Sequence, residues 1–283
     1  MIKTIRFIHT HFPIITKSFT SIFNFFITYI IKYRKKVITH NLKRSFPEKN
    51  EEIIKQIRQD FYRIFSNNFL EIIDFISHDK ARILKHLTCD ISNLDLEKGG
   101  IIMASHFGNW ERNLGSLPIF ISTPVLAFYK PLKSKYMNSL MQEIRGKFGV
   151  LVEPIDRTVR VLAGNKNKSI FYLFIADQGP VNMNGVYWNT FLNQRTPWLR
   201  GAEKLALKYQ LPVYYAHQSP LEDGKYHLHF SLISDQTTAM DSSDIIESYS
   251  RLLEAEIKQN PSYWLWSHRR WKRANTESQQ PIP

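Results

Sequence analysis

The sequence "GIIMASHFGNWERN", Gly100–Asn113, joins a short apolar run to residues typical of a turn and of a helix start. Its apolar run predicts a buried β-strand, Gly108 permits a tight turn, and Asn109 is a good N-cap for a helix that follows. His106 then stands at the carboxyl end of the strand, and Glu111 falls in the first helical turn, where the helix dipole favours a carboxylate. Open α/β sheets carry their sites at the carboxyl ends of their strands, so this stretch predicts both a fold class and a site.

The pattern continues on both sides of this stretch. Short apolar runs at 124–130, 169–177, 211–217 and 226–233 read as further strands, and helical patterns lie at 134–149, 199–210 and 244–260. A long amphipathic helix is expected at 51–77, with Asn50 as its cap. Alternating strands and helices predict an α/β fold whose sheet is mixed but largely parallel and flanked by helices. No linker separates two domains, so we expect a helical N-terminal arm on one α/β domain.

The composition limits the function without choosing it. Lys and Arg number 38 against 25 Asp and Glu, a net charge of +13 that favours an anionic partner such as nucleic acid, lipid or an acidic protein. The single cysteine, Cys89, excludes an internal disulfide and a cysteine-rich metal site. We expect no metal and no cofactor, because the phosphate-binding loop, dinucleotide and H-E-x-x-H motifs do not occur in the sequence.

The N-terminus is the most apolar part of the chain. Its longest uncharged run, 18–31, is 14 residues long, whereas a membrane-spanning helix needs about 20 apolar residues. No small-residue cleavage site follows, and the cluster "KYRKK" comes next at 32–36. Aromatic and aliphatic residues beside cations are typical of a helix lying on an anionic membrane surface; a buried core helix is the alternative, and a span is not excluded.

His106 and Glu111 form a candidate acid–base pair. Five residues apart on one helix they would point about 140° apart, but across a strand-to-helix turn their side chains can meet. A carboxylate that accepts from one imidazole nitrogen fixes the tautomer and leaves the other nitrogen as a base. No activated serine or cysteine accompanies them, so the base would act on a substrate hydroxyl directly. The alternative is a strand-end histidine beside a helix-capping glutamate.

"SHFGNWE" resembles the H-x4-D/E motif of glycerolipid-type acyltransferases, most closely the lipid A late acyltransferases of lipopolysaccharide assembly. Other stretches resemble this family in the same order: "YRKKVITHNLKRSFPEKN", "FYKPLKSKYMNSLM", "IRGKFG", "FIADQGP" and "WLWSHRRWK". The resemblance runs from about Tyr33 to Lys272. It departs from the family at Lys130, where arginine is usual, which puts specific phosphate recognition in doubt because the bidentate guanidinium is lost.

The resemblance implies a membrane-associated O-acyltransferase that moves a fatty acyl chain from acyl-carrier protein to a hydroxyl on a lipid A precursor, with no covalent acyl-enzyme. His106 would be the general base and Glu111 its orienting partner. Arg145, with Lys147 as the fallback, and Asp177 would position the substrate or the oxyanion.

The same resemblance leaves other residues with less defined roles. Lys130 and Arg269 would bind a phosphate or the carrier. Trp266, His268 and Arg269 could instead serve only to pack the fold. A turn-capping role for Asp177 and a solvated helix end for Arg145 are further alternatives.

The implied partners are acyl-carrier protein, an anionic glycolipid acceptor and a membrane surface, with no nucleic acid, at the cytoplasmic face of the bacterial inner membrane. The expected divisions are a membrane-associating segment at 1–40, an acyltransferase domain at 41–275 and a polar tail at 276–283. Three rival hypotheses stay open: the same chemistry on another glycolipid, aminolipid or aryl polyene-type lipid, a non-catalytic membrane-binding module, and a basic nucleic-acid-binding protein.

Overall fold

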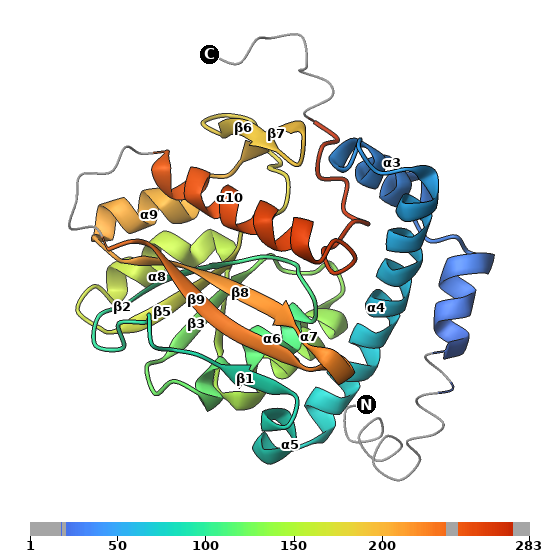
Figure 1. Ribbon diagram of the computed structural model, residues 1–283. Helices are drawn as coiled ribbons and strands as arrows, with labels where there is room; N and C mark the ends of the chain where they lie inside the picture. Colours follow the sequence, from blue (N-terminus) through green and yellow to red (C-terminus); the bar gives the residue numbers. More distant parts are fainter. Residues whose placement is uncertain (1–17, 19–20, 236–242, 274–283) are drawn as a thin grey trace.

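The computed structural model describes residues 18, 21–235 and 243–273, and it is built around one seven-stranded sheet (Figure 1). The strands lie in the order β1-β9-β8-β2-β5-β3-β4. Their bounds are β1 Leu87–Cys89, β2 Gly99–Ala104, β3 Val125–Tyr129, β4 Leu151–Pro154, β5 Ile170–Ile175, β8 Val213–Pro220 and β9 Tyr226–Ser234. The mixed, largely parallel sheet expected from the sequence is confirmed.

Strand direction sets the position of the site. β8, β2, β5, β3 and β4 are parallel to one another, and β9 pairs antiparallel with β8 and parallel with β1. β2 and β5 pair in register from Gly99 opposite Ile170 to Ala104 opposite Ile175. The residues that follow these two strands therefore leave the sheet side by side at its carboxyl edge.

Helices cover both faces of the sheet, and each face has its own core. The helices are α3 Lys35–Ser45, α4 Glu51–Ser77, α5 Lys80–Leu84, α6 Trp110–Gly115, α7 Lys135–Arg145, α8 Thr158–Gly164, α9 Gly201–Tyr209 and α10 Asp244–Gln259, and the short helical turns are η1 Phe26–Ile30, η2 Leu117–Ile119, η3 Gly146–Phe148, η4 Ile155–Arg157 and η5 Glu222–Gly224. β2 is buried along its whole length, with Ile101 and Met103 in one core and Ile102 and Ala104 in the other. This double burial explains why its sequence reads as a continuous apolar run instead of an alternating one.

α4 has the bounds that its periodicity predicts. The Asn50 side chain accepts a hydrogen bond from the Ile53 amide and so caps the first turn. The first half of α4 packs in the core shared with α9 and α10, and Phe75 and Ile76 at its end reach the core shared with α6 and α7. A single long helix thus spans the two cores along one side of the domain (Figure 1).

Several short elements were absent from the sequence-based prediction, among them β1, β4, α3 and the two-stranded hairpin of β6 Tyr187–Phe191 and β7 Gln194–Trp198. The expected boundary at residue 40 falls inside α3. The hairpin turns through Leu192 and Asn193, both at positive φ. A two-residue turn of this kind is normally signalled by Asn-Gly or Asp-Gly, and the leucine conceals it.

The prediction for the N-terminal segment is only partly covered, because residues 1–17 and 19–20 lie outside the described residues. Residues 21–25 are helical and lead into η1. Most of the large apolar side chains of residues 21–31 are solvent-exposed. Those at least half exposed are Ile22, Phe25, Tyr29, Ile30 and Ile31. Among the helices that the structure describes, none is both long and apolar enough to cross a membrane.

Candidate active site

The turn after β2 has the geometry expected from its residues. Gly108 adopts φ +55°, and a Cβ built on it would lie 2.5 Å from a ring carbon of Tyr226, so a larger residue would be strained and would have to displace this ring. The Asn109 side chain accepts from the Arg112 amide at 3.2 Å and caps α6. His106 is thereby fixed before the turn, and Glu111 lies in the first turn of α6.

α4 holds this turn from outside. Asn68 donates to the Gly108 carbonyl at 2.8 Å, and the Asn109 amide donates to Glu71 at 2.9 Å. Glu71 also lies 3.2 Å from the guanidinium of Arg112, which is 4% exposed. These bonds tie the strand-to-helix turn to a rigid element, as a positioned catalytic group requires.

His106 pairs with Asp177, the residue two positions beyond the end of β5. Asp177 Oδ1 lies 2.6 Å from His106 Nδ1, and Oδ2 accepts from the His106 amide at 3.0 Å and from Trp264 Nε1 at 2.8 Å. Burial raises the pKa of the Asp177 carboxyl, but the electrostatic interaction with His106 and these hydrogen bonds outweigh burial, so that the net pKa lies below its ordinary value. An ionised carboxylate only accepts, so Nδ1 carries the proton and Nε2 has a free lone pair.

The expectation that Glu111 orients the histidine is therefore corrected. Glu111 instead accepts two hydrogen bonds from Arg145 at the end of α7, from Nε at 2.8 Å and from Nη2 at 2.5 Å. The reason is the sheet register, which brings Asp177 beside His106, whereas the first turn of α6 faces α7. Burial lowers the pKa of the Arg145 guanidinium, but the hydrogen bonds and charge of Glu111 outweigh burial and raise this pKa overall.

The second ring nitrogen of His106, Nε2, lies on the solvent side of the ring, and one side chain, Gln178, contacts it. Gln178 Nε2 lies 3.1 Å from His106 Nε2, and Gln178 is exposed. The ring edge of Trp110 contacts the imidazole at a centroid separation of 5.0 Å. A substrate hydroxyl would reach the lone pair of Nε2 by taking the place of the Gln178 amide.

Residues 263–273 (the closing segment), the last part of the chain that the structure describes, cover the same edge of the sheet. The Leu265 amide donates to the His106 carbonyl at 3.1 Å, and Trp264 contributes the indole bond to Asp177. Trp266 is fully buried, and its carbonyl accepts from Asn41 of α3 at 2.9 Å. The closing segment thus both packs the fold and completes the histidine pair.

Two contacts of the His106–Asp177 pair, Trp264 to Asp177 and Gln178 to His106, were not predicted from the sequence. Trp264 lies inside the quoted closing motif and Gln178 directly follows Asp177, so both were in view as sequence motifs. What the sequence could not supply was the register that brings three segments to one imidazole.

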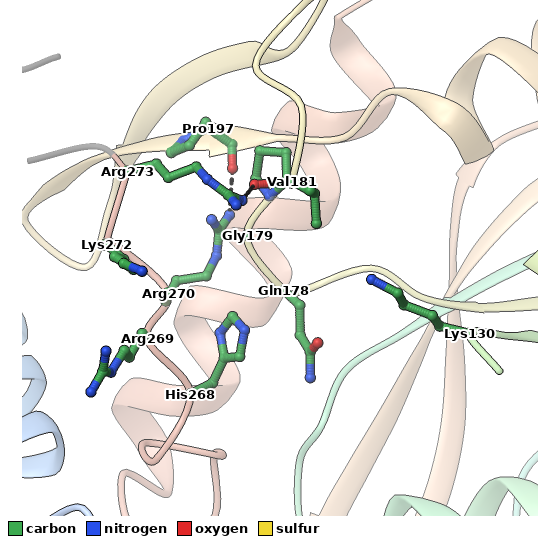
Figure 2. Close-up of a pocket in the computed structure, with 11 residues that line it drawn as sticks. Lys130, Gln178, Gly179, Val181, Pro197, His268, Arg269, Arg270, Lys272 and Arg273 are labelled. Atoms are coloured by element: carbon green, nitrogen blue, oxygen red, sulfur yellow. Dashed lines mark hydrogen bonds between the residues drawn. The ribbon is translucent and has the colours of Figure 1, made fainter. Parts of the chain in front are cut away.

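The remaining candidate residues divide into two groups. Lys147 donates to the carbonyls of Phe75 and His78, so it caps the end of α4. Of the two candidates for positioning the substrate or the oxyanion, Arg145 is therefore the one we retain. Lys130 and Arg269 come together on one cavity beside Gln178, together with His268 (Figure 2). Among the described residues no group of three His, Cys, Asp or Glu side chains is placed to hold a metal ion.

Comparisons with known proteins agree with the sequence motifs. The model of the bacterial lipid A biosynthesis acyltransferase family matches residues 7–273. A search of curated proteins gave no match. Among solved structures, the chain is similar to the 1-acyl-sn-glycerophosphate (LPA) acyltransferase PlsC from Thermotoga maritima, with 13% identity and a TM-score of 0.40 over 87% of this chain and 96% of that one.

The family match covers nearly the whole chain, including the strand-end histidine, the Asp177 loop and the closing segment. The chain therefore belongs to the bacterial lipid A biosynthesis acyltransferase family, and it is an acyltransferase.

Proposed function

We propose that this acyltransferase moves a fatty acyl chain from acyl-carrier protein to a hydroxyl of a lipid A precursor, and that His106 is its general base. The observation that carries the proposal is the His106–Asp177 pair at the carboxyl edge of the sheet, where Asp177 fixes the tautomer and Nε2 is directed to solvent. No hydroxyl or thiol nucleophile of the chain touches Nε2 among its described contacts, which favours direct attack by the substrate.

The reaction then runs in two steps. Nε2 takes the proton of the acceptor hydroxyl while the hydroxyl oxygen attacks the thioester carbonyl. This gives a tetrahedral oxyanion and an imidazolium stabilised by Asp177. The intermediate collapses, the carbon–sulfur bond breaks, and the departing thiolate takes the proton from Nε2 as a thiol. An ester is formed and the histidine is regenerated without a covalent acyl-enzyme.

Arg145 is our candidate for stabilising the oxyanion. Its Nε and Nη2 are held by Glu111, which leaves Nη1 for a ligand, and its side chain is 24% exposed. A guanidinium fixed by two bonds is preorganised, so it need not reorganise when charge develops on the carbonyl oxygen. In this proposal Glu111 acts through Arg145 as a positioning residue.

The N-terminal segment would hold the enzyme on its lipid substrate. The exposed Phe25, Tyr29 and Ile30 lie next to Lys32 and Lys35, and apolar groups beside cations suit the interface of an anionic membrane. Attachment at the cytoplasmic face of the inner membrane is the matching location.

The proposal is tested by weighing products. The purified protein is incubated with defined acyl-carrier proteins and a tetra-acylated lipid A precursor, and in parallel with an aminolipid and a phosphate-free glycolipid as acceptors. We expect the lipid A precursor to gain the mass of one acyl chain. If only another acceptor is acylated, lipid A is not the substrate. If no acyl-carrier protein supports transfer to any acceptor, the proposed acyl donor is wrong.

A further inference from the structure

A basic cavity adjoins the base. It has a volume of about 290 Å³, and Gln178, whose amide contacts His106 Nε2, is part of its wall (Figure 2). Its cationic lining residues are Lys130, Arg269, Arg270, Lys272 and Arg273. Among the described residues that line it, none is acidic. A cavity of this charge attracts an anion strongly and concentrates the field of its walls.

Arg270 lies in the wall of the cavity and uses only part of its hydrogen-bonding capacity. Its side chain is 2% exposed, its Nη2 donates to the Pro197 carbonyl at 2.8 Å, and its guanidinium lies 4.4 Å from the Trp198 ring centroid. Its Nε and Nη1 are buried and have no hydrogen-bond partner. Unsatisfied buried donors on a charged group are costly, so this arrangement is stabilised when an acceptor oxygen enters the cavity.

Two neighbours keep space for such an acceptor. A Cβ built on Gly179 would lie 3.6 Å from Arg270 Nη1 and 2.9 Å from the Arg270 carbonyl oxygen, so the glycine permits the close approach of the two segments and adds no side chain beside Nη1. His268 Nδ1 is also buried without a partner. Burial lowers the pKa of His268 to about 4, and a neutral imidazole can donate this N–H to an oxygen.

The outer wall supplies exposed cations. Lys130 follows β3, and Arg269 and Lys272 lie on the closing segment; all three are exposed. Two segments distant in sequence thus place cations around the same cavity, and the buried Arg270 is a further part of its wall. Mobile ammonium groups around a fixed guanidinium suit the several oxygens of a phosphate.

We infer that this cavity binds a phosphate monoester of the acceptor lipid and so places the acceptor hydroxyl at His106. The inference rests on the proposed function for its choice of acceptor. A phosphate monoester carries up to two charges and three terminal oxygens, which match the cluster of cations. The carrier is a poorer fit, because its phosphodiester has one charge and is separated from the thioester by the whole pantetheine arm, whereas this cavity lies one side chain from the base.

The test compares two acceptors, the phosphorylated lipid A precursor and the same lipid after removal of its phosphates. The variant is Arg269→Ala/Lys272→Ala, and the matched control is Lys98→Ala/Lys168→Ala, which removes the same charge from exposed positions just before β2 and β5, at the opposite edge of the sheet. We expect the ratio of kcat/KM for the phosphorylated over the dephosphorylated acceptor to fall by about 10-fold or more in the variant and to keep the wild-type value in the control. A ratio that stays at the wild-type value, whether both activities are kept or both fall equally, would overturn the inference.

A binding measurement separates this inference from the proposed function. Calorimetry of the protein with glucosamine 1-phosphate, inorganic phosphate and glucosamine needs no acyl transfer. We expect saturable binding of the sugar phosphate by the wild type, the control and His106→Ala, and weaker binding by Arg269→Ala/Lys272→Ala. We expect that none of these proteins binds glucosamine. Sugar phosphate bound without any acylation of lipid A would defeat only the proposed function. Acylation without phosphate-dependent binding would defeat only the inference, and tighter binding of free phosphate would reassign the cavity to that ion.

Discussion

His106 and Asp177 leave neighbouring strands at the same register, each two residues beyond a strand end, and their side chains meet at 2.6 Å. The backbone amide of His106 also donates to the same carboxylate, at 3.0 Å. Asp177 thus fixes the position, the orientation and the tautomer of the imidazole together. The proposed catalysis rests on this pairing rather than on the five-residue spacing to Glu111.

Asp177→Asn should leave the fold intact and lower kcat by about 100-fold or more. One amide oxygen can still accept from the His106 amide or from Trp264, but the NH₂ group opposes the proton on Nδ1 and favours the other tautomer, which removes the lone pair from Nε2. Steady-state kinetics measure the loss, and circular dichroism verifies the fold. Activity equal to that of the wild type would mean that Asp177 does not orient the base.

Glu111 and Arg145 should behave as one unit. A double-mutant cycle with Glu111→Gln and Arg145→Gln should give a coupling free energy of about 1–3 kcal/mol in transition-state stabilisation, because either single change already breaks the bidentate pair. The ratio of kcat/KM values in the four proteins measures it. Additive effects would show that the two residues act independently, and full activity in Arg145→Gln would exclude it as the oxyanion donor.

Gly108→Ala should destabilise the protein by at least about 1–3 kcal/mol. Its φ of +55° is strained for alanine, and the new Cβ would meet the Tyr226 ring. Gly164→Ala in α8 is the matched control, since a Cβ there meets nothing within 4 Å, and it should be neutral or slightly stabilising. Urea unfolding monitored by fluorescence gives both values; equal effects would remove the special role of the turn.

Glu256 should make stability fall with rising pH. Burial raises the pKa of this carboxyl to about 7, against the hydrogen bonds from Tyr215 and the Gln218 amide that lower it. From pH 4.5 to about 7 the folded protein therefore holds a proton that the unfolded chain releases, so the free energy of unfolding decreases over this window.

Glu256→Gln keeps an acceptor for the Gln218 amide and cannot ionise. Urea unfolding of the wild type and this variant at a series of pH values gives a difference that isolates Glu256 from other titrating groups. We expect the wild type to lose stability relative to the variant from pH 4.5 to about 7, with a constant difference above. Parallel curves across this window would show that Glu256 titrates normally.

Much of the fold could be predicted from local patterns. The apolar period of α4 and its Asn50 cap gave both ends of a helix, and the runs around β2, β3, β5, β8 and β9 gave five strands. β1 and β4 were not found because runs of three and four residues carry too little periodicity. Pro197 within β7 also argued against a strand there, although this short hairpin lies outside the main sheet and tolerates it.

The site could be predicted only as far as local geometry reaches. Gly108, Asn109 and the strand end identified His106, since each acts within a few residues of the next. The partner of His106 could not be identified in this way, because Asp177 is 71 positions away and only the pairing of β2 with β5 brings it near. Arg270 lay within a quoted motif, yet its unsatisfied donors are visible only once Gly179 and Trp198 surround it.

A single-turnover measurement of acyl transfer by His106→Ala tests most directly whether His106 is the general base. The wild type and the variant, each in excess over a radiolabelled acyl-carrier protein, are mixed with the lipid A precursor, and the label is followed into lipid. We expect the variant to transfer at least about 100-fold more slowly, with no labelled protein other than the carrier in either reaction. Transfer at the wild-type rate, or a labelled acyl-enzyme, would contradict direct catalysis by His106.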